Sequence, residues 1–114
     1  MKVIVCGGRD YANVEFLTLV LDELHAKMPI SQVIQGGAKG ADSLAFDWAI
    51  RTKGVSVTTH HAEWEKYGRR AGPIRNGLML EDCPDLVVAF PGGRGTADMV
   101  RQAKAAGIQV VEVE

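Results

Sequence analysis

The chain has 114 residues and a formal net charge of −1 at pH 7, and 46% of its residues are hydrophobic. Its length fits one domain around a single core, and its near-neutral charge argues against binding nucleic acid through bulk electrostatic attraction. No apolar run approaches the roughly 20 residues of a membrane span, and no signal-peptide pattern is visible, so we expect one cytoplasmic domain over residues 1–114 with no membrane partner.

The first quarter of the chain predicts a buried strand followed by an amphipathic helix. Residues 2–6 form an apolar run without alternation, which is typical of a central parallel strand covered on both faces. Asn13 can cap the next helix, because apolar residues recur at helical spacing from Leu17 to Met28. Pro29 then ends this helix, since proline disrupts a helix interior.

The next segment repeats this arrangement and then departs from it. Residues 31–35 predict a second strand, and Trp48 belongs to the apolar face of the helix that follows, so we interpret it as a core residue. Gly54 suits the position just after this helix, and residues 55–60 predict a third strand. The connection over residues 61–72 is longer than most connections in α/β units, so we expect it to be functional.

The last part of the chain continues the alternation. Pro73 suits the first turn of a helix that ends near Cys83. Residues 85–90 predict a fourth strand, and a helix then extends to Gly107. Residues 108–113 predict a fifth strand.

Strict alternation of strands and helices predicts an α/β fold of the three-layer, Rossmann-like kind. We expect a doubly wound parallel sheet of five strands in the order 3-2-1-4-5, with helices on both faces. In this order the first and fourth strands are neighbours where the winding reverses, and ligands bind beside the carboxyl ends of the strands at that point. The loops after these two strands are therefore expected to meet.

Three of the predicted strands end in double glycines. Gly7-Gly8 follows the first strand, Gly36-Gly37 follows the second, and the segment 91–96 follows the fourth and opens a helix. Glycines let a ligand approach the backbone, and the N–H groups at a helix start favour an anion, most simply a phosphate. The alternative for these glycines is a purely structural role in tight turns.

Several Lys and Arg residues lie in or beside these loops, so we expect cations to gather at one end of a nearly neutral molecule. Such cations pair well with phosphate, although an arginine can also be a solvated surface charge. Together with the glycines, the candidate ligand- or phosphate-binding residues are Gly7, Gly8, Arg9, Asp10, Gly36, Gly37, Lys39, Asp42, Arg75, Pro91, Gly92, Gly93, Arg94, Gly95 and Thr96.

Two aspartates near these loops and three residues of the long connection are further candidates. Asp10 can form an Asx-turn and Asp42 can cap or start a helix, or either carboxylate can bind a ribose. Trp64, Tyr67 and Arg70 lie in the long connection and are candidates for a lid over the site. Base stacking on the two aromatic rings is the lesser alternative.

The cysteine and histidine spacings predict no metal or redox site. Cys6 and Cys83 form no CxxC pattern, so we interpret both as buried, reduced thiols. His60 and His61 are adjacent on a predicted strand and point to opposite faces, and no third ligand is spaced for a shared ion. We therefore expect no metal and no cofactor.

Four motifs resemble those of the YspA-type, YpsA-related branch of the SLOG superfamily, and the resemblance covers nearly the whole chain. The motifs are Gly-Gly-Arg-Asp-Tyr at 7–11, Gly-Gly-Ala-Lys-Gly-Ala-Asp at 36–42, the segment 64–76 with Trp64, Tyr67-Gly68, Ala71-Gly72 and Arg75-Asn76, and Ala-Phe-Pro-Gly-Gly-Arg-Gly-Thr at 89–96. The resemblance implies a Rossmann-like domain that binds nucleotides or nucleotide-derived ligands, and it adds Asn76 to the candidate site. It implies no settled reaction.

A more distant resemblance is to the cytokinin-activating phosphoribohydrolases, which carry Pro-Gly-Gly-x-Gly-Thr-x-x-Glu and a helix arginine and cleave the base from a nucleoside monophosphate. The residues that match this motif are Pro91, Gly92, Gly93, Gly95 and Thr96. Arg75 is the counterpart of the helix arginine. The glutamate position holds Met99, and the nearest carboxylate, Asp98, is turned by about 100° on a helix. Cleavage needs an aligned carboxylate, so this departure argues against hydrolysis.

Three functions remain, in order of preference. The first is a sensor or signalling module that binds a nucleotide-derived small molecule. The second is a nucleotide N-ribohydrolase with Arg75, Asp98 and Asp10 as candidate catalytic residues. The third is binding of single-stranded DNA, which the related DNA-processing protein A family performs and which the net charge disfavours. We also expect a homodimer, because related folds pair through helices and a domain of this size has a small core.

Overall fold

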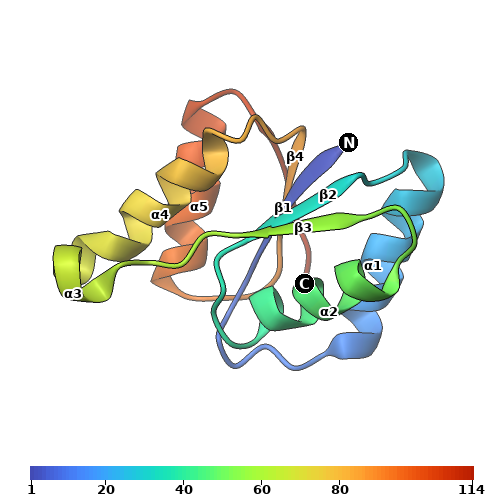
Figure 1. The fold of residues 1–114 in the computed structure, drawn as a ribbon, viewed down its shortest axis with the longest axis horizontal. Helices are drawn as coiled ribbons and strands as arrows, with labels where there is room; N and C mark the ends of the chain where they lie inside the picture. The colour runs from blue at the N-terminus through green and yellow to red at the C-terminus, as the bar shows by residue number, and fades with distance from the viewer.

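The computed structural model describes residues 1–114, and strands alternate with helices along the chain (Figure 1). The strands are β1 (Lys2–Cys6), β2 (Gln32–Gln35), β3 (Ser56–Thr59), β4 (Leu86–Ala89) and β5 (Gln109–Glu112). The helices are α1 (Val14–Lys27), α2 (Ala41–Arg51), α3 (Trp64–Tyr67), the 3-10 helix η1 (Gly68–Arg70), α4 (Ala71–Leu80) and α5 (Arg94–Ala105). Each strand lies within a range that the sequence pattern predicts.

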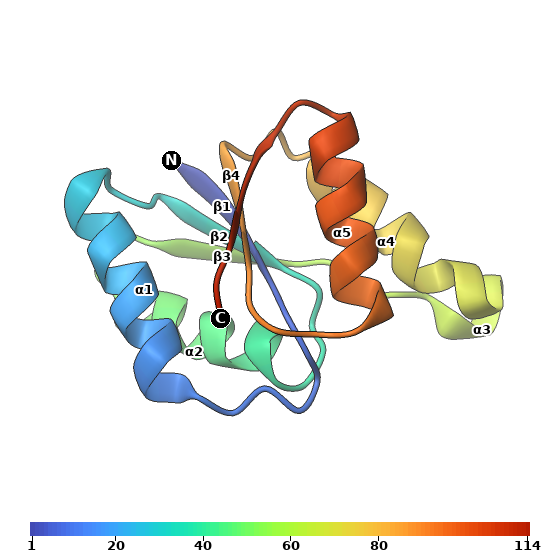
Figure 2. The same ribbon diagram turned by 180° about the vertical axis from the view of Figure 1, so that it is seen from behind.

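The strands form one parallel sheet in the order β3-β2-β1-β4-β5, which confirms the doubly wound Rossmann-like topology. Helices α1 and α2 cover one face of the sheet, and α4 and α5 cover the other (Figures 1 and 2). Strands β1 and β4 are neighbours, with Val3 opposite Leu86 and Cys6 opposite Ala89. Their carboxyl ends therefore open at the same edge, where the winding of the chain reverses.

Side chains of β1 alternate between two separate parts of the core. Val3 and Val5 pack with α1 and α2, in a cluster that includes Trp48. Ile4 and Cys6 pack with α4 and α5 on the other face. Trp48 is only 2% exposed, and its Nε1 donates to Asp22 Oδ1 at 2.9 Å, which confirms its expected place in the core. The unbroken apolar run of β1 thus reflects burial on both faces.

Helix boundaries agree with the sequence signals in α1 and differ in the 61–72 connection. The Asn13 side chain accepts a hydrogen bond from the N–H of Phe16 at 3.1 Å, so it caps α1 as predicted. Pro73 lies in the first turn of its helix, as expected, but α4 already begins at Ala71. The long connection is not irregular throughout, because it contains α3 and η1, which project from one end of the molecule (Figure 1).

One cysteine assignment from the sequence is wrong. Cys6 is buried at the end of β1, but Cys83 is exposed in the turn after α4, where its φ is +59°. A turn with left-handed backbone faces water because it belongs to no packed face of a helix or strand. None of the helices is both long and apolar enough to cross a membrane.

Candidate functional site

Gly8 links the three Gly-rich loops. Its N–H donates to the carbonyl of Pro91 at 2.8 Å, and its own carbonyl accepts from the N–H of Ala41, the first residue of α2, at 3.1 Å. A Cβ on Gly40 would lie 2.1 Å from that carbonyl oxygen, and the φ of Gly40 is +78°, so glycine alone fits there. These contacts hold the loops after β1, β2 and β4 together, as the sheet order predicts.

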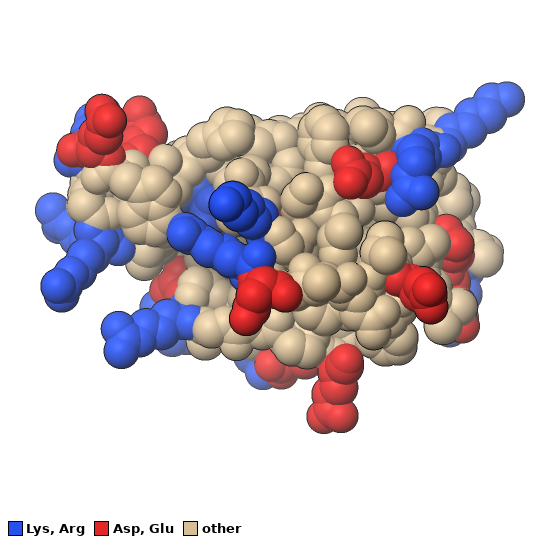
Figure 3. Space-filling model, turned by 90° about the horizontal axis from the view of Figure 1, so that it is seen from below, with Lys and Arg blue, Asp and Glu red and all other residues tan.

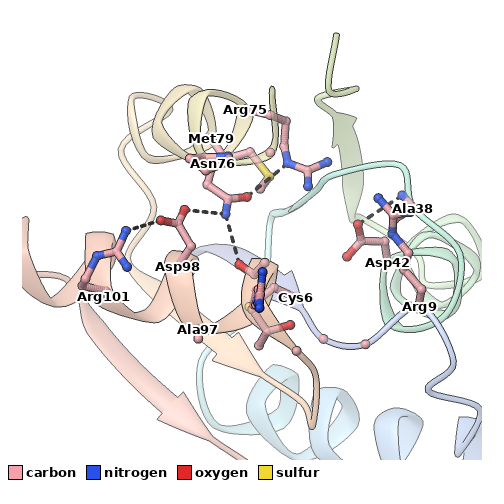
Figure 4. Close-up of a pocket in the computed structure, with 18 of the residues that line it drawn as sticks. Cys6, Arg9, Ala38, Asp42, Arg75, Asn76, Met79, Ala97, Asp98 and Arg101 are labelled. Carbon is pink, nitrogen blue, oxygen red and sulfur yellow. Dashed lines mark hydrogen bonds and ion pairs between the residues drawn. The ribbon is translucent and has the colours of Figure 1, made fainter. Parts of the chain in front are cut away.

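A cleft of about 780 Å³ opens beside this junction (Figure 4). Its volume is within the range of small-molecule binding sites, which is roughly 300–1,000 Å³. The candidate residues that line it are Gly7, Gly8, Arg9, Asp10, Asp42, Trp64, Arg75, Asn76, Gly93, Arg94, Gly95, Thr96 and Asp98. The structure therefore brings most of the candidates into one cleft.

The remaining candidates lie outside this cleft. A neighbouring cavity of about 550 Å³ is lined by Gly36, Gly37 and Lys39. The candidates that line neither cavity are Pro91, Gly92, Tyr67 and Arg70. Of the three proposed lid residues, Trp64 alone therefore faces the cleft, while the Tyr67 ring lies 5.0 Å from the Lys66 ammonium.

Several residues line the cleft without belonging to the candidate set, namely Cys6, Ala38, Arg69, Gly72, Pro73, Met79, Ala97 and Arg101. Two of them, Arg69 and Arg101, add positive charge. The basic composition of the 61–72 connection is a signal for Arg69. No local motif marks Arg101. It lines the cleft because it lies on the side of α5 that carries Asp98 and faces α4 (Figure 4).

The start of α5 presents free donors to the cleft. Gly93 precedes the helix, and the first hydrogen bond within it runs from the N–H of Ala97 to the Gly93 carbonyl at 3.0 Å. The N–H groups of Arg94, Gly95 and Thr96 donate to no protein acceptor. Since these groups lie at the positive end of the helix dipole, they favour an anion at this point.

A chain of hydrogen bonds holds Arg75 in the wall of the cleft (Figure 4). Its Nη1 donates to the Gly36 carbonyl at 2.7 Å, and its Nε donates to Asn76 Oδ1 at 3.1 Å. The Asn76 amide in turn donates to the Gly95 carbonyl at 3.2 Å and to Asp98 Oδ2 at 3.0 Å. Arg75 therefore joins the loop after β2 to the start of α5, and its Nη2 group has no protein acceptor.

Asp98 faces the cleft, whereas its neighbour Met99 is fully buried in the core. The Asp98 carboxylate forms an ion pair with Arg101 and accepts a hydrogen bond from Gln102 at 2.7 Å, in addition to its bond from Asn76. Both carboxylate oxygens are thus occupied by protein donors. This arrangement makes Asp98 a support for Asn76 and Arg101.

Asp42 is a buried carboxyl group on the wall of the cleft opposite Asp98 (Figure 4). Burial raises its pKa, and the bond that its Oδ2 accepts from the N–H of Ala38 at 3.1 Å and the nearby Arg75 guanidinium partly offset this effect. Burial likewise lowers the pKa of Arg75, with Asp42 acting in the opposite direction. The polar groups of Asp42 and Arg75 both lie beside Gly36, and each charge offsets part of the effect of burial on the pKa of the other group.

Cys6 lies at the floor of the cleft, yet it is not set up as a nucleophile. Burial, reinforced by the negative charge of Asp42, raises the pKa of its thiol from 9.0 to about 12. A thiol becomes reactive when its environment favours the thiolate, and this environment favours the protonated form. Cys6 therefore acts as a small apolar residue in the cleft.

Arginines dominate the charge of the cleft. Its lining contains Arg9, Arg69, Arg75, Arg94 and Arg101 and only three aspartates. The Arg9 guanidinium lies 5.5 Å from the centre of the Trp64 ring, so the long connection and the loop after β1 meet over the opening. Among the Lys and Arg side chains visible from below, most lie on one half of this face (Figure 3).

The fold and this cleft define a Rossmann-like α/β domain with an arginine-lined cleft at the switch point of its sheet. The model of the family described as the YspA, cpYpsA-related SLOG family matches residues 1–67, and the chain belongs to this family. The gene 61 protein of Mycobacterium phage D29 is 38% identical to this chain over 117 residues, which cover 96% of the chain and 94% of that protein.

Proposed function

We propose that the protein binds a nucleotide or nucleotide-derived ligand in the cleft beside β1 and β4 and acts as a sensor or signalling module. Membership of the SLOG family supports a ligand of this class. The binding residues in this proposal come from the loops after β1 and β4 and from α4. The phosphate would accept from the free N–H groups at the start of α5 and from arginine side chains.

The observation that carries this proposal is that two kinds of hydrogen-bond donor without a protein acceptor line the same cleft: the backbone N–H groups at the start of α5 and an arginine Nη2 group. Arg94, Gly95 and Thr96 supply backbone N–H groups, and Arg75 supplies an Nη2 group held in place by Gly36 and Asn76. Preorganised donors of this kind cost little entropy when an anion binds. The cleft volume of about 780 Å³ leaves room for a ribose and a base beside the phosphate.

The proposal is tested by identifying what the protein retains and what it binds. Native mass spectrometry of the purified protein should show a small molecule in the mass range of nucleotides, and its release by denaturation allows identification. Titration calorimetry with adenosine and guanosine nucleotides should then give saturable binding that Arg75→Ala weakens. Failure of every nucleotide to bind, together with the absence of a retained ligand, would overturn the proposal.

A second candidate function is hydrolysis of the N-glycosidic bond of a nucleoside monophosphate. The observation in its favour is that Asp98 lines the cleft although the glutamate position holds buried Met99. Against it, both Asp98 oxygens already accept protein hydrogen bonds, so the carboxylate lacks a free oxygen for a cation-like sugar. We therefore rank hydrolysis below binding.

Chromatography separates these two functions. Incubation with adenosine or guanosine monophosphate should return the nucleotide intact if the protein is a binding module. Release of free base, lost in Asp98→Asn, would establish the hydrolase instead. A buffer incubation without protein controls for spontaneous cleavage.

A further inference from the structure

A second cavity adjoins the main cleft, with a volume of about 550 Å³. The two cavities share four lining residues, namely Arg9, Ala38, Trp64 and Arg75. The second one is bounded further by the loop after β2 and by the segment that follows β3, where His61 and Ala62 lie. Space therefore continues from the main cleft past Arg9 and Arg75 to Lys39 and His61.

The charge of the second cavity differs from that of the main cleft. Arg9, Lys39, Arg75 and His61 line it, and no carboxylate does. Arg9, Lys39 and Arg75 form no ion pair within the protein. Asp42 acts on Arg75 and Arg9 through space, but it is buried on the side of the main cleft. Unpaired cations in one cavity repel each other, and an anion placed between them relieves that repulsion.

Two backbone N–H groups of the loop after β2 are already occupied, so the side chains of Lys39 and His61 are the more distinctive donors of this cavity. The N–H of Gly37 donates to Gln35 Oε1 at 2.6 Å, and the N–H of Ala38 donates to Asp42. A Cβ on Gly37 would lie 2.5 Å from the His61 ring, and Gly37 has φ of +73°, so glycine here lets the imidazole lie against the loop. The geometry therefore keeps His61 at the wall of the cavity.

We infer that the ligand carries two separated anionic groups, the first at the start of α5 and the second in the cavity of Lys39 and His61. Its class is a nucleotide with two phosphates on different positions of the sugar, because the two sets of donors line different cavities joined past Arg9 and Arg75. In this inference, two phosphates joined directly to each other would both lie at the start of α5 and would leave the second cavity empty. This inference rests on the proposed function, since it takes the main cleft as the nucleotide site.

The test compares three adenosine nucleotides by calorimetry: the 5′-monophosphate, the 5′-diphosphate and the 3′,5′-bisphosphate, with the guanosine series in parallel. The two doubly phosphorylated compounds differ mainly in the position of the second phosphate. We expect the 3′,5′-bisphosphate to bind roughly tenfold to a hundredfold more tightly than the monophosphate, as a charge-assisted contact gives. The 5′-diphosphate should gain much less.

The variant Lys39→Ala should lower the affinity ratio of bisphosphate to monophosphate by roughly tenfold, because one of the cations that line the second cavity is lost. Lys53→Ala, which removes an exposed lysine outside both cavities, should keep the wild-type ratio. In a two-dimensional NMR spectrum, the bisphosphate should shift the signals of the His61 ring and the Gly37 amide, and the monophosphate should leave them in place.

Equal affinities for the monophosphate and the bisphosphate would overturn the inference while leaving the proposed nucleotide site intact. An affinity ratio unchanged by Lys39→Ala would do the same, since the second phosphate would then lie elsewhere. If no nucleotide of either series binds, both the inference and the proposed function fail.

Discussion

Arg75 is held at the boundary of the two cavities by contacts that leave part of its guanidinium free. Its Nη1 and Nε bind Gly36 and Asn76, and the Nη2 group has no protein partner. At the scale of single residues, the candidate site therefore depends on side chains such as Arg75, which are held in position by neutral or buried hydrogen-bond acceptors. An anion that enters the cleft meets donors that are already oriented.

Arg75→Ala should weaken nucleotide binding about tenfold to a hundredfold, because a charge-assisted bond to phosphate contributes roughly 1.5–3 kcal/mol. It should also lower the free energy of unfolding by about 1–2 kcal/mol, since Gly36 and Asn76 lose their donor. Calorimetry and urea unfolding measure the two effects. Arg75→Lys keeps the charge and loses the fork, so it should recover only part of the affinity. Unchanged affinity in Arg75→Ala would show that the residue is structural only.

Asp42 should make stability depend on pH. Its pKa is raised in the folded state, mainly by burial, so the folded protein binds the proton more tightly than the unfolded chain does. The contribution of Asp42 to stability is therefore largest below pH 3.8, the ordinary pKa of an aspartate, and is lost as the pH rises through the raised folded-state pKa. Asp42→Asn lacks this titration.

The measurement for Asp42 is the difference in unfolding free energy between wild type and Asp42→Asn across the acidic range. The wild type should become more stable relative to Asp42→Asn as the pH falls. A difference that stays constant, or moves in favour of the variant, would contradict the raised pKa of the Asp42 carboxyl.

The two thiols should differ sharply in reactivity. Cys83 is exposed, whereas Cys6 is buried with a pKa raised to about 12. A disulfide reagent at neutral pH should therefore modify one thiol per native chain and both after denaturation. Cys83→Ser should abolish the native reaction. Rapid modification of both thiols in the native protein would show that the floor of the cleft is open to the reagent.

At the scale of elements, the site depends on three loops that are fixed to each other. Gly8 bonds to Pro91 and to Ala41, and Gly40 packs directly on the Gly8 carbonyl. The loops therefore form one rigid platform at the carboxyl ends of the strands. Helix α3 and η1, in contrast, have no buried residues and project beyond the platform, which suits a segment that moves over a ligand (Figure 1).

Gly40→Ala should destabilise the protein by about 3 kcal/mol or more, because the new Cβ meets the Gly8 carbonyl oxygen at 2.1 Å and the backbone φ is +78°. Gly95→Ala is the matched control, since its Cβ meets nothing within 4 Å and alanine favours a helix. It should be neutral or slightly stabilising. Urea unfolding of both variants tests the rigid platform, and equal stabilities would contradict it.

At the scale of the whole molecule, each face of the sheet is covered by two helices, and some apolar side chains remain outside. Phe46 and Ile50 are exposed on α2, and Ile74 and Leu78 are exposed on α4, each pair at the spacing of one helical turn. Exposed apolar pairs on helices are suited to association between chains.

We expect a homodimer that pairs through helices. Light scattering should give twice the chain mass of 12.3 kDa. Ile50→Glu and Leu78→Glu, made separately, should identify the face involved, because the variant on the paired face returns the monomer mass. The monomer mass for the wild type at high protein concentration would refute the dimer.

The sequence by itself determined the fold class and which Gly-rich loops meet at the carboxyl ends of the strands. Periodicity marks each strand and helix locally, and strict alternation leaves few topologies for five parallel strands. The double glycines at 7–8, 36–37 and 92–93 mark the loops, because turns and close backbone approaches have local requirements. The fourth and first strands could therefore be placed side by side without any knowledge of distant contacts.

Only the tertiary structure decided which side chains line the cleft. Arg101 reaches the cleft, and Asp98 supports Asn76, because α5 is rotated against α4 in one particular way. Cys83 is exposed because its turn is left outside both core clusters. The position of Arg75 against Gly36 depends on a contact between residues 39 positions apart. Such outcomes follow from packing between segments that are distant in the sequence, and local sequence patterns do not encode that packing.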